Sequence, residues 1–324
     1  MQIFKSPNFN FVRWRWHAIV LSLVVILAGL GMLVRHGGLP LGVEFEGGTI
    51  VILEFEQSPD IAGVRQALAA GMPGGDNAIV QRYGDAGSNE VLIRVSEVGA
   101  EQGGELSRTA EVVKQTLEKA NVGAFREAGT EIVGPIVGEQ LRRQGILATV
   151  LALAGILVYI ALRFQFSFAV GAVVATIHDL LVTLSFLVFF QYDITLNVIA
   201  AILTITGYSV NDTIVVFDRV RENMRSMRRD RLEQIVNVAV NQTLARTVIT
   251  AGTTLFAVTA LFLFGGEVLE GFAFTMMVGI ISGTYSTIFI AAAIAILWQG
   301  KRPLKGQPQQ AATGEAPRRR RRAS

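Results

Sequence analysis

Two clusters of polar and ionisable residues interrupt long apolar segments of this 324-residue chain. In the first, Asp212 follows Asn211 near the end of one apolar segment, and Arg246 lies near the start of the next. The second cluster is the adjacent pair His178 and Asp179, near the midpoint of another apolar segment. An ionisable side chain at the centre of a membrane helix costs about 2.5–3.5 kcal/mol on insertion scales, so both clusters are candidates for ion pairs or proton sites.

Asp212 belongs to a polar stripe along one face of its predicted helix. The members, which fall within about 100° of one another at 100° per residue, are Asn197, Ala201, Thr204, Tyr208, Asn211, Asp212 and Arg219. The opposite face carries Ile, Leu and Val. A polar stripe over five turns cannot face lipid, so it must face other helices or water.

The predicted depths of Asp212 and Arg246 allow the two side chains to pair. Asp212 lies about 8 Å from the end of its apolar segment at 1.5 Å per residue, and Arg246 lies about one turn inside its own. The pair could be a static link between two helices, and Arg246 could also reach the lipid head groups. Alternatively, Asp212 is a proton site that alternately binds a proton and pairs. The residues alone leave these interpretations open.

His178 and Asp179 share their helix with Thr176 and Thr183, which lie on the same face as Asp179. A hydrogen-bonded pair in the helix core is the favoured interpretation, and a second relay element is the alternative. The chain has no cysteine, only three histidines, and no HExxH, G-x-S-x-G or Walker A motif. The sequence therefore predicts no enzyme, no metal site and no cofactor.

Six apolar segments are long enough to cross a bilayer. They are 18–34, 146–162, 166–190, 194–217, 244–264 and 272–298. Only 17% of residues are charged and mean hydropathy is +0.45, whereas soluble domains carry about 25% charge. The first segment is followed by no A-x-A cleavage site, so we interpret it as a retained anchor.

The segment 36–144 has the alternation and turns of a soluble domain. Predicted strands at 50–56, 78–83, 91–95 and 124–133 and helices at 60–69 and 106–120 give the order β-α-β-β-α-β of a ferredoxin-like unit. The expected fold is a polytopic α-helical membrane protein, with six transmembrane helices and this α+β periplasmic domain between the first two. The predicted divisions are 1–35, 36–144, 145–299 and a disordered basic tail, 300–324.

Charge segregation predicts the orientation of the chain. Basic residues gather at both termini, at the turn with Arg163 and at 219–246, whereas 36–144 and the turns with Asp193, Glu267 and Glu270 are acidic. By the positive-inside rule, both termini are cytoplasmic and 36–144 lies outside. The five arginines at 318–322 are interpreted as a solvated end, with anionic lipid as the next candidate ligand and no nucleic acid expected.

Two glycine-containing segments flank the predicted domain. Gly47 and Gly48 follow Glu44 before the first strand, and Gly134 and Gly138 precede the second apolar segment. Because glycine is common where the backbone takes unusual angles, we expect a turn at the first segment and a matching hinge at the second.

Four motifs resemble the SecF family of bacterial protein-export membrane proteins. They are GYSVNDTIVVFDRVREN at 207–223, GVEFEGGT at 42–49, VGPIVG at 133–138 and NQTLART at 241–247. The family usually has Asp where this chain has Glu44. It is related to the resistance-nodulation-division exporters, so the resemblance implies half of such an architecture, in the bacterial inner membrane, with SecD as the other half.

The resemblance also implies a role. Asp212 and Arg246 would be the proton-conducting pair, and Tyr208, Asn211, Asn197, His178 and Asp179 would be supporting polar residues. The complex would use the proton-motive force to promote movement of unfolded preprotein through SecYEG, with YajC and YidC as further partners. The alternatives are half of a small-molecule exporter of the same superfamily and a membrane scaffold that conducts no ions.

Overall fold

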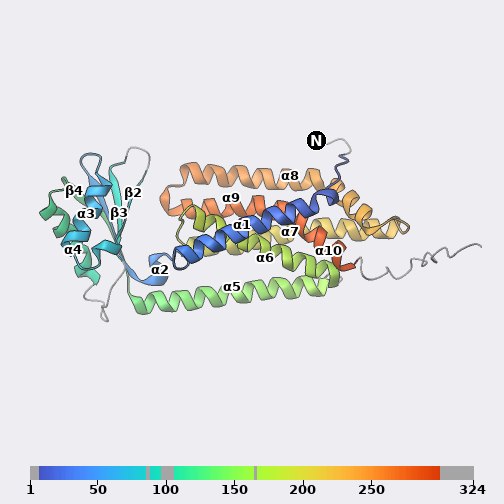
Figure 1. The fold of residues 1–324 in the computed structure, drawn as a ribbon, viewed down its shortest axis with the longest axis horizontal. Coiled ribbons are helices and arrows are strands. Elements are labelled where there is room, and N and C mark those ends of the chain that lie inside the picture. Colours follow the sequence, from blue (N-terminus) through green and yellow to red (C-terminus); the bar gives the residue numbers. More distant parts are fainter. Residues whose placement is uncertain (1–6, 85–87, 96–105, 164–165, 300–324) are drawn as a thin grey trace, which may run out of the picture.

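The structure is a computed structural model that describes residues 7–84, 88–95, 106–163 and 166–299. A small domain built on a β-sheet (the sheet domain) lies at one end of a bundle of long helices (Figure 1).

Six helical spans of the described chain are long and apolar enough to cross a membrane, which confirms the predicted number. They are α1 (Arg15–Arg35), α5 (Pro135–Arg163), α6 (Phe166–Phe189), α7 (Leu196–Ser226), α8 (Leu232–Phe264) and a last span formed by α9 (Glu267–Ser286), a π-helical turn (Thr287–Ala291) and α10 (Ala292–Gln299). A short 3-10 helix, Val12–Trp14, precedes α1. The chain is therefore a multi-pass membrane protein.

The sheet domain has the predicted ferredoxin-like order. Its elements are α2 (Val43–Glu46), β1 (Gly48–Phe55), α3 (Ile61–Gly71), a 3-10 turn (Gly75–Asn77), β2 (Ile79–Tyr83), β3 (Glu90–Val95), α4 (Leu106–Ala120) and β4 (Phe125–Val133). The four strands are antiparallel in the order β2-β3-β1-β4. Asp60 begins α3 by accepting a hydrogen bond from the Ala62 backbone, 3.0 Å away.

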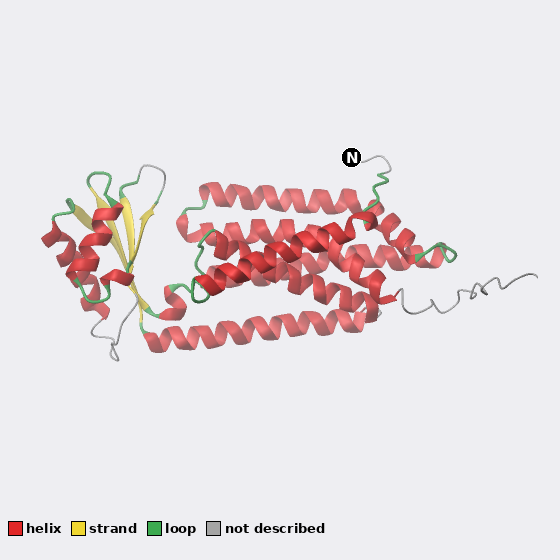
Figure 2. Ribbon diagram, in the orientation of Figure 1, coloured by secondary structure: helices red, strands yellow, loops and turns green. Residues whose placement is uncertain are grey.

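The two faces of the sheet have different neighbours because side chains alternate along β1. Val51 and Leu53 are fully buried in a core shared with α3 and α4. Ile50, on the other face, packs with Val43 of α2. Figure 2 shows that the strands lie between their two helices and the membrane bundle. The second face of the sheet is therefore the side that meets the bundle.

Three helices extend beyond the predicted apolar segments. α5 begins at Pro135, so the predicted boundary at 144/145 falls inside a continuous helix. Proline is favoured at the first helical position, where its missing N–H costs nothing. α7 continues through the basic sequence to Ser226, and α8 already begins at Leu232. Hydropathy located the apolar parts of these helices and missed their polar ends.

Small residues bring the central helices close together. A Cβ on Gly29 of α1 would overlap Ser185 of α6, and a Cβ on Gly171 of α6 would lie 2.7 Å from the Ala291 carbonyl oxygen. On α9, a Cβ on Gly283 would lie 2.9 Å from the Ser209 Cβ of α7. Such contacts are the usual basis of helix packing in membranes. In contrast, α5 and α8 lie on opposite edges of the bundle in Figure 1, and few residues in their most apolar stretches are buried within this chain.

Candidate functional site

Asp212 lies where α7 meets α8. Its Oδ1 accepts a hydrogen bond from the Thr247 hydroxyl of α8 at 2.7 Å. Its Oδ2 is buried and has no hydrogen-bond partner among the described residues. A carboxylate oxygen is a strong acceptor, so this second oxygen is the place where a proton, a water or a donor from another protein could bind.

Arg246 does not pair with Asp212 in this structure. The part of the chain that the structure describes contains no ion pair for Arg246, and its side chain is exposed. Its charge is nevertheless close enough to act on the Asp212 carboxylate. The difference arises because successive residues of a helix are 100° apart, so that α8 turns Thr247 toward α7 and Arg246 outward.

The polar stripe of α7 is partly exposed and partly covered by other helices. Asn197, Thr204 and Asn211 are exposed, and Tyr208 is half-buried against apolar side chains of α8 and α9. Asn197 donates to the Val268 carbonyl at 3.3 Å, the one hydrogen bond described for this group of four that reaches another helix. The sequence analysis predicted that the stripe faces other helices or water. α8 and α9 cover part of it, since Ala201 is fully buried among their side chains and Asp212 bonds Thr247. Asn197, Thr204 and Asn211 are the members left exposed to water or to a partner protein.

α8 adds polar groups beside this stripe. Thr250 and Thr253 follow Arg246 on its exposed face, and both hydroxyls donate to carbonyls of their own helix. Each Thr hydroxyl thus has an acceptor within α8, whereas the described residues provide no hydrogen bond or ion pair for the exposed Arg246 side chain. We call the exposed polar residues of α7 and α8 the α7–α8 surface: Asn197, Thr204, Asn211, Arg246, Thr250 and Thr253.

Asp179 is the centre of a second polar site, and it is 4% exposed. Four donors surround its carboxylate. They are the Ser209 hydroxyl of α7 at 2.5 Å, the Ser286 and Ser282 hydroxyls of α9 at 2.7 and 2.9 Å, and the His178 Nδ1 at 3.0 Å. This arrangement links three helices through one side chain. The predicted hydrogen-bonded pair is present, but the sequence analysis missed the three serines.

The spacing of two of these serines in the sequence indicates that they share a helix face. Ser282 and Ser286 are four residues apart, so they lie on one face of α9. Ser209 lies three residues before Asp212, about 4.5 Å along α7. The two polar sites are therefore separated by about one turn of that helix. No group of three or more His, Asp and Glu side chains that could hold a metal ion occurs in the described residues.

The loop between α6 and α7 connects the bundle to the sheet domain. Asp193 forms an ion pair with Arg94 of β3, whose side chain is 8% exposed. Backbone hydrogen bonds join Gly42 N to Ile194 O at 2.8 Å and Ile194 N to Pro40 O at 2.7 Å. This junction was not predicted, because a lone acidic loop residue carries no signal about its partner.

Tyr192 connects the loop between α6 and α7 to the first turns of α9. Its hydroxyl donates to the Glu270 carboxylate of α9, and its ring stacks on Phe274 with centroids 4.5 Å apart. Burial, followed by the hydrogen bond to Glu270, raises the pKa of the Tyr192 hydroxyl. Tyr192 therefore stays a neutral hydrogen-bond donor at any pH near neutrality.

The predicted glycine turn is present at Gly47 and Gly48, with φ of 77° and 138°. Glu44 is half-buried within α2, just before this turn. On the other side, Gly134 precedes α5, but Gly138 is helical, and a Cβ there would lie 3.0 Å from the Gly47 backbone nitrogen. Gly138 thus permits close packing of α5 on the turn, which differs from the hinge loop expected at that position.

Replacing Gly47 by Ala is expected to destabilise the connection between α2 and β1. Its φ of 77° and ψ of 161° place it in a region that is open to glycine alone, and strain of this kind costs about 1–3 kcal/mol. Thermal unfolding in detergent would show a lower midpoint. Gly31→Ala is the control, because no atom lies within 4 Å of a Cβ there and its midpoint should not fall.

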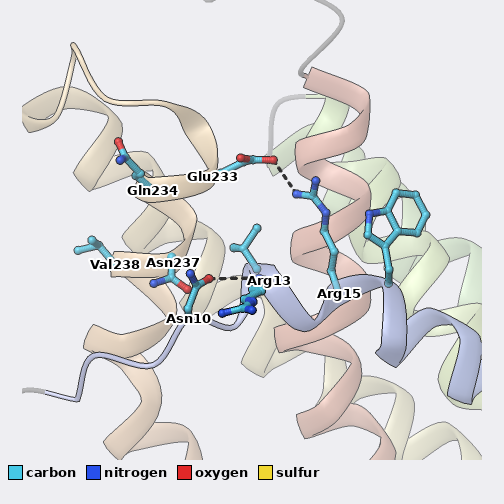
Figure 3. Close-up of a pocket in the computed structure, with 9 residues that line it drawn as sticks. Asn10, Arg13, Arg15, Glu233, Gln234, Asn237 and Val238 are labelled. Atoms are coloured by element: carbon cyan, nitrogen blue, oxygen red, sulfur yellow. Dashed lines mark hydrogen bonds and ion pairs between the residues drawn. The ribbon is translucent and has the colours of Figure 1, made fainter.

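The opposite end of the bundle holds a pocket between the N-terminal segment and α8 (Figure 3). Arg15 forms an ion pair with Glu233 at 2.7 Å, and Asn237 accepts a hydrogen bond from the Phe11 backbone at 2.9 Å. Asn241, in the fourth motif, bonds the backbone N and O of Phe9. Glu233, Asn237 and Asn241 of α8 therefore hold the N-terminal segment against this helix.

Comparison with known proteins places these features in a family. The family model "Protein export membrane protein SecD/SecF, C-terminal" matches residues 112–301, and the "SecD/SecF GG Motif" matches residues 36–59, which contain Gly47 and Gly48. The protein translocase subunit SecF of Pseudomonas aeruginosa is 40% identical over 90% of this chain and 92% of its own length. That of Koribacter versatilis is 35% identical over 98% of both.

A solved structure has the same fold. The crystal structure of SecDF, a translocon-associated membrane protein from Thermus thermophilus, superposes with a TM-score of 0.78 at 33% identity. The match covers 91% of this chain, which spans 39% of that SecDF chain. The expected resemblance is confirmed, since both the sequence and the fold agree along most of the chain. The chain belongs to the SecF branch of the SecD/SecF family of protein-export membrane proteins.

Proposed function

We propose that this chain pairs with SecD as an accessory subunit of the Sec protein translocase and uses the proton-motive force to promote preprotein movement across the membrane. The observation that carries the proposal is the exposed α7–α8 surface together with the Asp212 carboxylate, whose buried Oδ2 has no hydrogen-bond partner among the described residues. A polar surface of this kind is costly against lipid, so it requires a partner with its own polar groups. A SecD half, joined to this half in one chain in the Thermus protein, suits that requirement.

In this proposal the protein lies in the bacterial inner membrane with both termini in the cytoplasm. The basic N-terminal segment and the basic end of α7 lie at the same end of the bundle, opposite the sheet domain. The positive-inside rule then puts the sheet domain in the periplasm. The tail at 300–324, interpreted as a solvated end with anionic lipid as the next candidate ligand, lies outside the described residues.

Asp212 acts as the proton carrier. A proton from the periplasmic side binds the free Oδ2 and neutralises the carboxylate, which weakens its attraction to the nearby Arg246 charge. Arg246, for which the described residues provide no anion, then reorients toward the partner, and α7 moves relative to α8. Release of the proton to the cytoplasm restores the charge. The Thr247 hydroxyl can donate to Asp212 in both states, because one oxygen remains an acceptor.

Movement reaches the preprotein through the sheet domain. α7 is joined to this domain by the loop that carries Asp193, which pairs with Arg94, and by the hydrogen bonds at Ile194. A shift of α7 would therefore move β3 through the ion pair between Asp193 and Arg94. The domain rotates about Gly47, Gly48 and Gly134, and its new position prevents the emerging polypeptide from sliding back.

The energy available sets a limit on this coupling. One charge moving through 100 mV supplies about 2.3 kcal/mol, which shifts a two-state equilibrium about fifty-fold. A change from 1:99 to 99:1 requires about 5.5 kcal/mol. A single proton at this potential therefore biases the domain without switching it completely, so the cycle uses more than one proton or two states of nearly equal energy.

Inverted membrane vesicles carrying this chain, SecD and SecYEG test the proposal. A preprotein stalled after ATP is exhausted should move forward when a proton gradient is imposed and slide back when it is collapsed. Purification in mild detergent should recover SecD, with SecYEG, YajC and YidC as looser partners. Rescue of drug sensitivity without any effect on export would contradict the proposal and favour a small-molecule exporter.

A further inference from the structure

His178 has a hydrogen-bonding arrangement that a purely structural histidine does not need. Its Nδ1 lies 3.0 Å from Asp179 Oδ1, and its ring stacks on Tyr285 with centroids 6.1 Å apart. Its Nε2 is buried and has no hydrogen-bond partner among the described residues. The side chain is 8% exposed. A buried ring nitrogen without a partner is uncommon, since desolvating it is costly.

The surroundings fix which nitrogen is free. The Asp179 carboxylate receives three serine hydroxyls, so its remaining hydrogen bond, to His178, is best filled by an Nδ1–H donor. In the neutral ring Nε2 then carries a lone pair. Nε2 can therefore bind one proton, which forms an imidazolium beside an ionised Asp179 and breaks none of the existing hydrogen bonds.

Few other ionisable groups lie around this ring. On α6 there is Asp179, on α9 Tyr285, and on α7 Asp212, one turn beyond Ser209. α1 contributes Ser22, which donates to the Tyr285 hydroxyl at 3.3 Å. The charged or titratable residues of α1, which are Arg15, His17 and Arg35, lie in its first and last turns. The imidazolium would thus have one close counterion, Asp179.

The neighbouring backbone is also unusual. A π-helical turn, Thr287–Ala291, begins directly after Ser286, and Thr287 bonds Thr213 of α7 at 2.9 Å. Isolated π turns inside α-helices occur frequently at functional sites. A change of charge at His178 would therefore act where α9 is irregular and where α7 and α9 are in contact.

We propose that His178 is a second proton-binding site, oriented by Asp179, that is loaded through Nε2 in the same cycle as Asp212. This inference rests on the proposed proton coupling. Two protons crossing 100 mV together shift a two-state equilibrium about 2,500-fold, against about fifty-fold for one. The larger factor approaches the roughly 10,000-fold change that complete switching needs.

The small number of histidines permits a direct test. His17 and His36 are exposed, so the double variant His17→Gln/His36→Gln leaves His178 as the single histidine of the protein. With ¹⁵N-labelled histidine in proteoliposomes, the nitrogen resonances report tautomer and protonation directly. We expect the Nδ1–H form at the alkaline end of the pH range studied and protonation of Nε2 toward its acidic end. An Nε2–H tautomer, or an Nε2 whose resonance is constant over this range, overturns the inference.

His178→Gln supplies the functional readout. The Gln amide can still donate to Asp179, but it cannot bind a proton. In infrared difference spectra, the variant should still show the protonated-carboxyl band that Asp212 is expected to give when a proton gradient is imposed. The number of protons moved per cycle should fall from two to one. If the Nε2 resonance does not change with pH while export still responds to the proton gradient, this inference fails and the proposed function stands. If Nε2 binds a proton but export ignores the gradient, the site stands and the proposed function fails.

Discussion

Replacing Asp212 by Asn is expected to abolish the stimulation of export by a proton gradient, while insertion into the membrane and assembly with SecD stay intact. Asn has nearly the same shape, and its carbonyl oxygen can accept the Thr247 hydroxyl as Oδ1 does. It cannot bind and release a proton near neutral pH. The rate of preprotein movement with and without the gradient, in vesicles depleted of ATP, measures the effect.

Asp218→Asn is the matched control for this experiment. Asp218 lies on the same helix in the same motif, but its side chain is 44% exposed, and the ion pairs described for it are with the partly exposed Arg163 and Arg221. Exposed pairs of this kind contribute about 0–1 kcal/mol, so the stimulation should be unchanged. Full stimulation in the Asp212 variant at an unchanged gradient would show that the proton carrier lies elsewhere.

Replacing Asp193 by Ala is expected to release the sheet domain from the bundle. The change leaves the Arg94 guanidinium buried without its anion, and breaking a buried ion pair costs about 3–5 kcal/mol. Because Asp193 is 26% exposed, we expect the lower end of this range, about 3 kcal/mol. This free energy corresponds to about a 150-fold increase in the ratio of undocked to docked domain. Because the chain has no cysteine, spin labels at Glu118→Cys and Leu263→Cys can report the distance between α4 and α8 by pulsed electron resonance.

Two further variants distinguish this effect from a general loss of stability. The double change Arg94→Leu/Asp193→Leu removes both charges, so no charge remains buried without its partner. The distance between the two spin labels should then return to the single value of the unchanged protein. Glu54→Ala removes an exposed pair with Arg126 on the same sheet and should leave the distance unchanged. One narrow, unshifted distance in Asp193→Ala would show that the ion pair does not hold the domain in place.

The elements of this protein were largely predictable because their signals are local. Apolar segments of sufficient length gave all six spans, and alternation with turn residues gave the strands of the sheet domain. The errors lie at polar helix ends, such as the start of α5 at Pro135 and of α8 at Leu232, which hydropathy does not detect. The charged end of α7 to Ser226 was missed for the same reason.

The sites were less predictable because they depend on contacts between helices. Depth and spacing suggested that Asp212 could meet Arg246, but the rotation of α8 presents Thr247 instead. The pairing of His178 with Asp179 followed from adjacency, whereas its serine partners come from α7 and α9. Arg94 and Asp193 are 99 residues apart, and nothing local connects them.

Infrared difference spectroscopy on proteoliposomes of this chain with SecD tests the central claim most directly. When a proton gradient is imposed, the account predicts a protonated-carboxyl band that appears, disappears when the gradient is collapsed, and is absent from the Asp212→Asn protein. A spectrum in which this carboxyl keeps one ionisation state with and without the gradient, while export continues to respond, would contradict it.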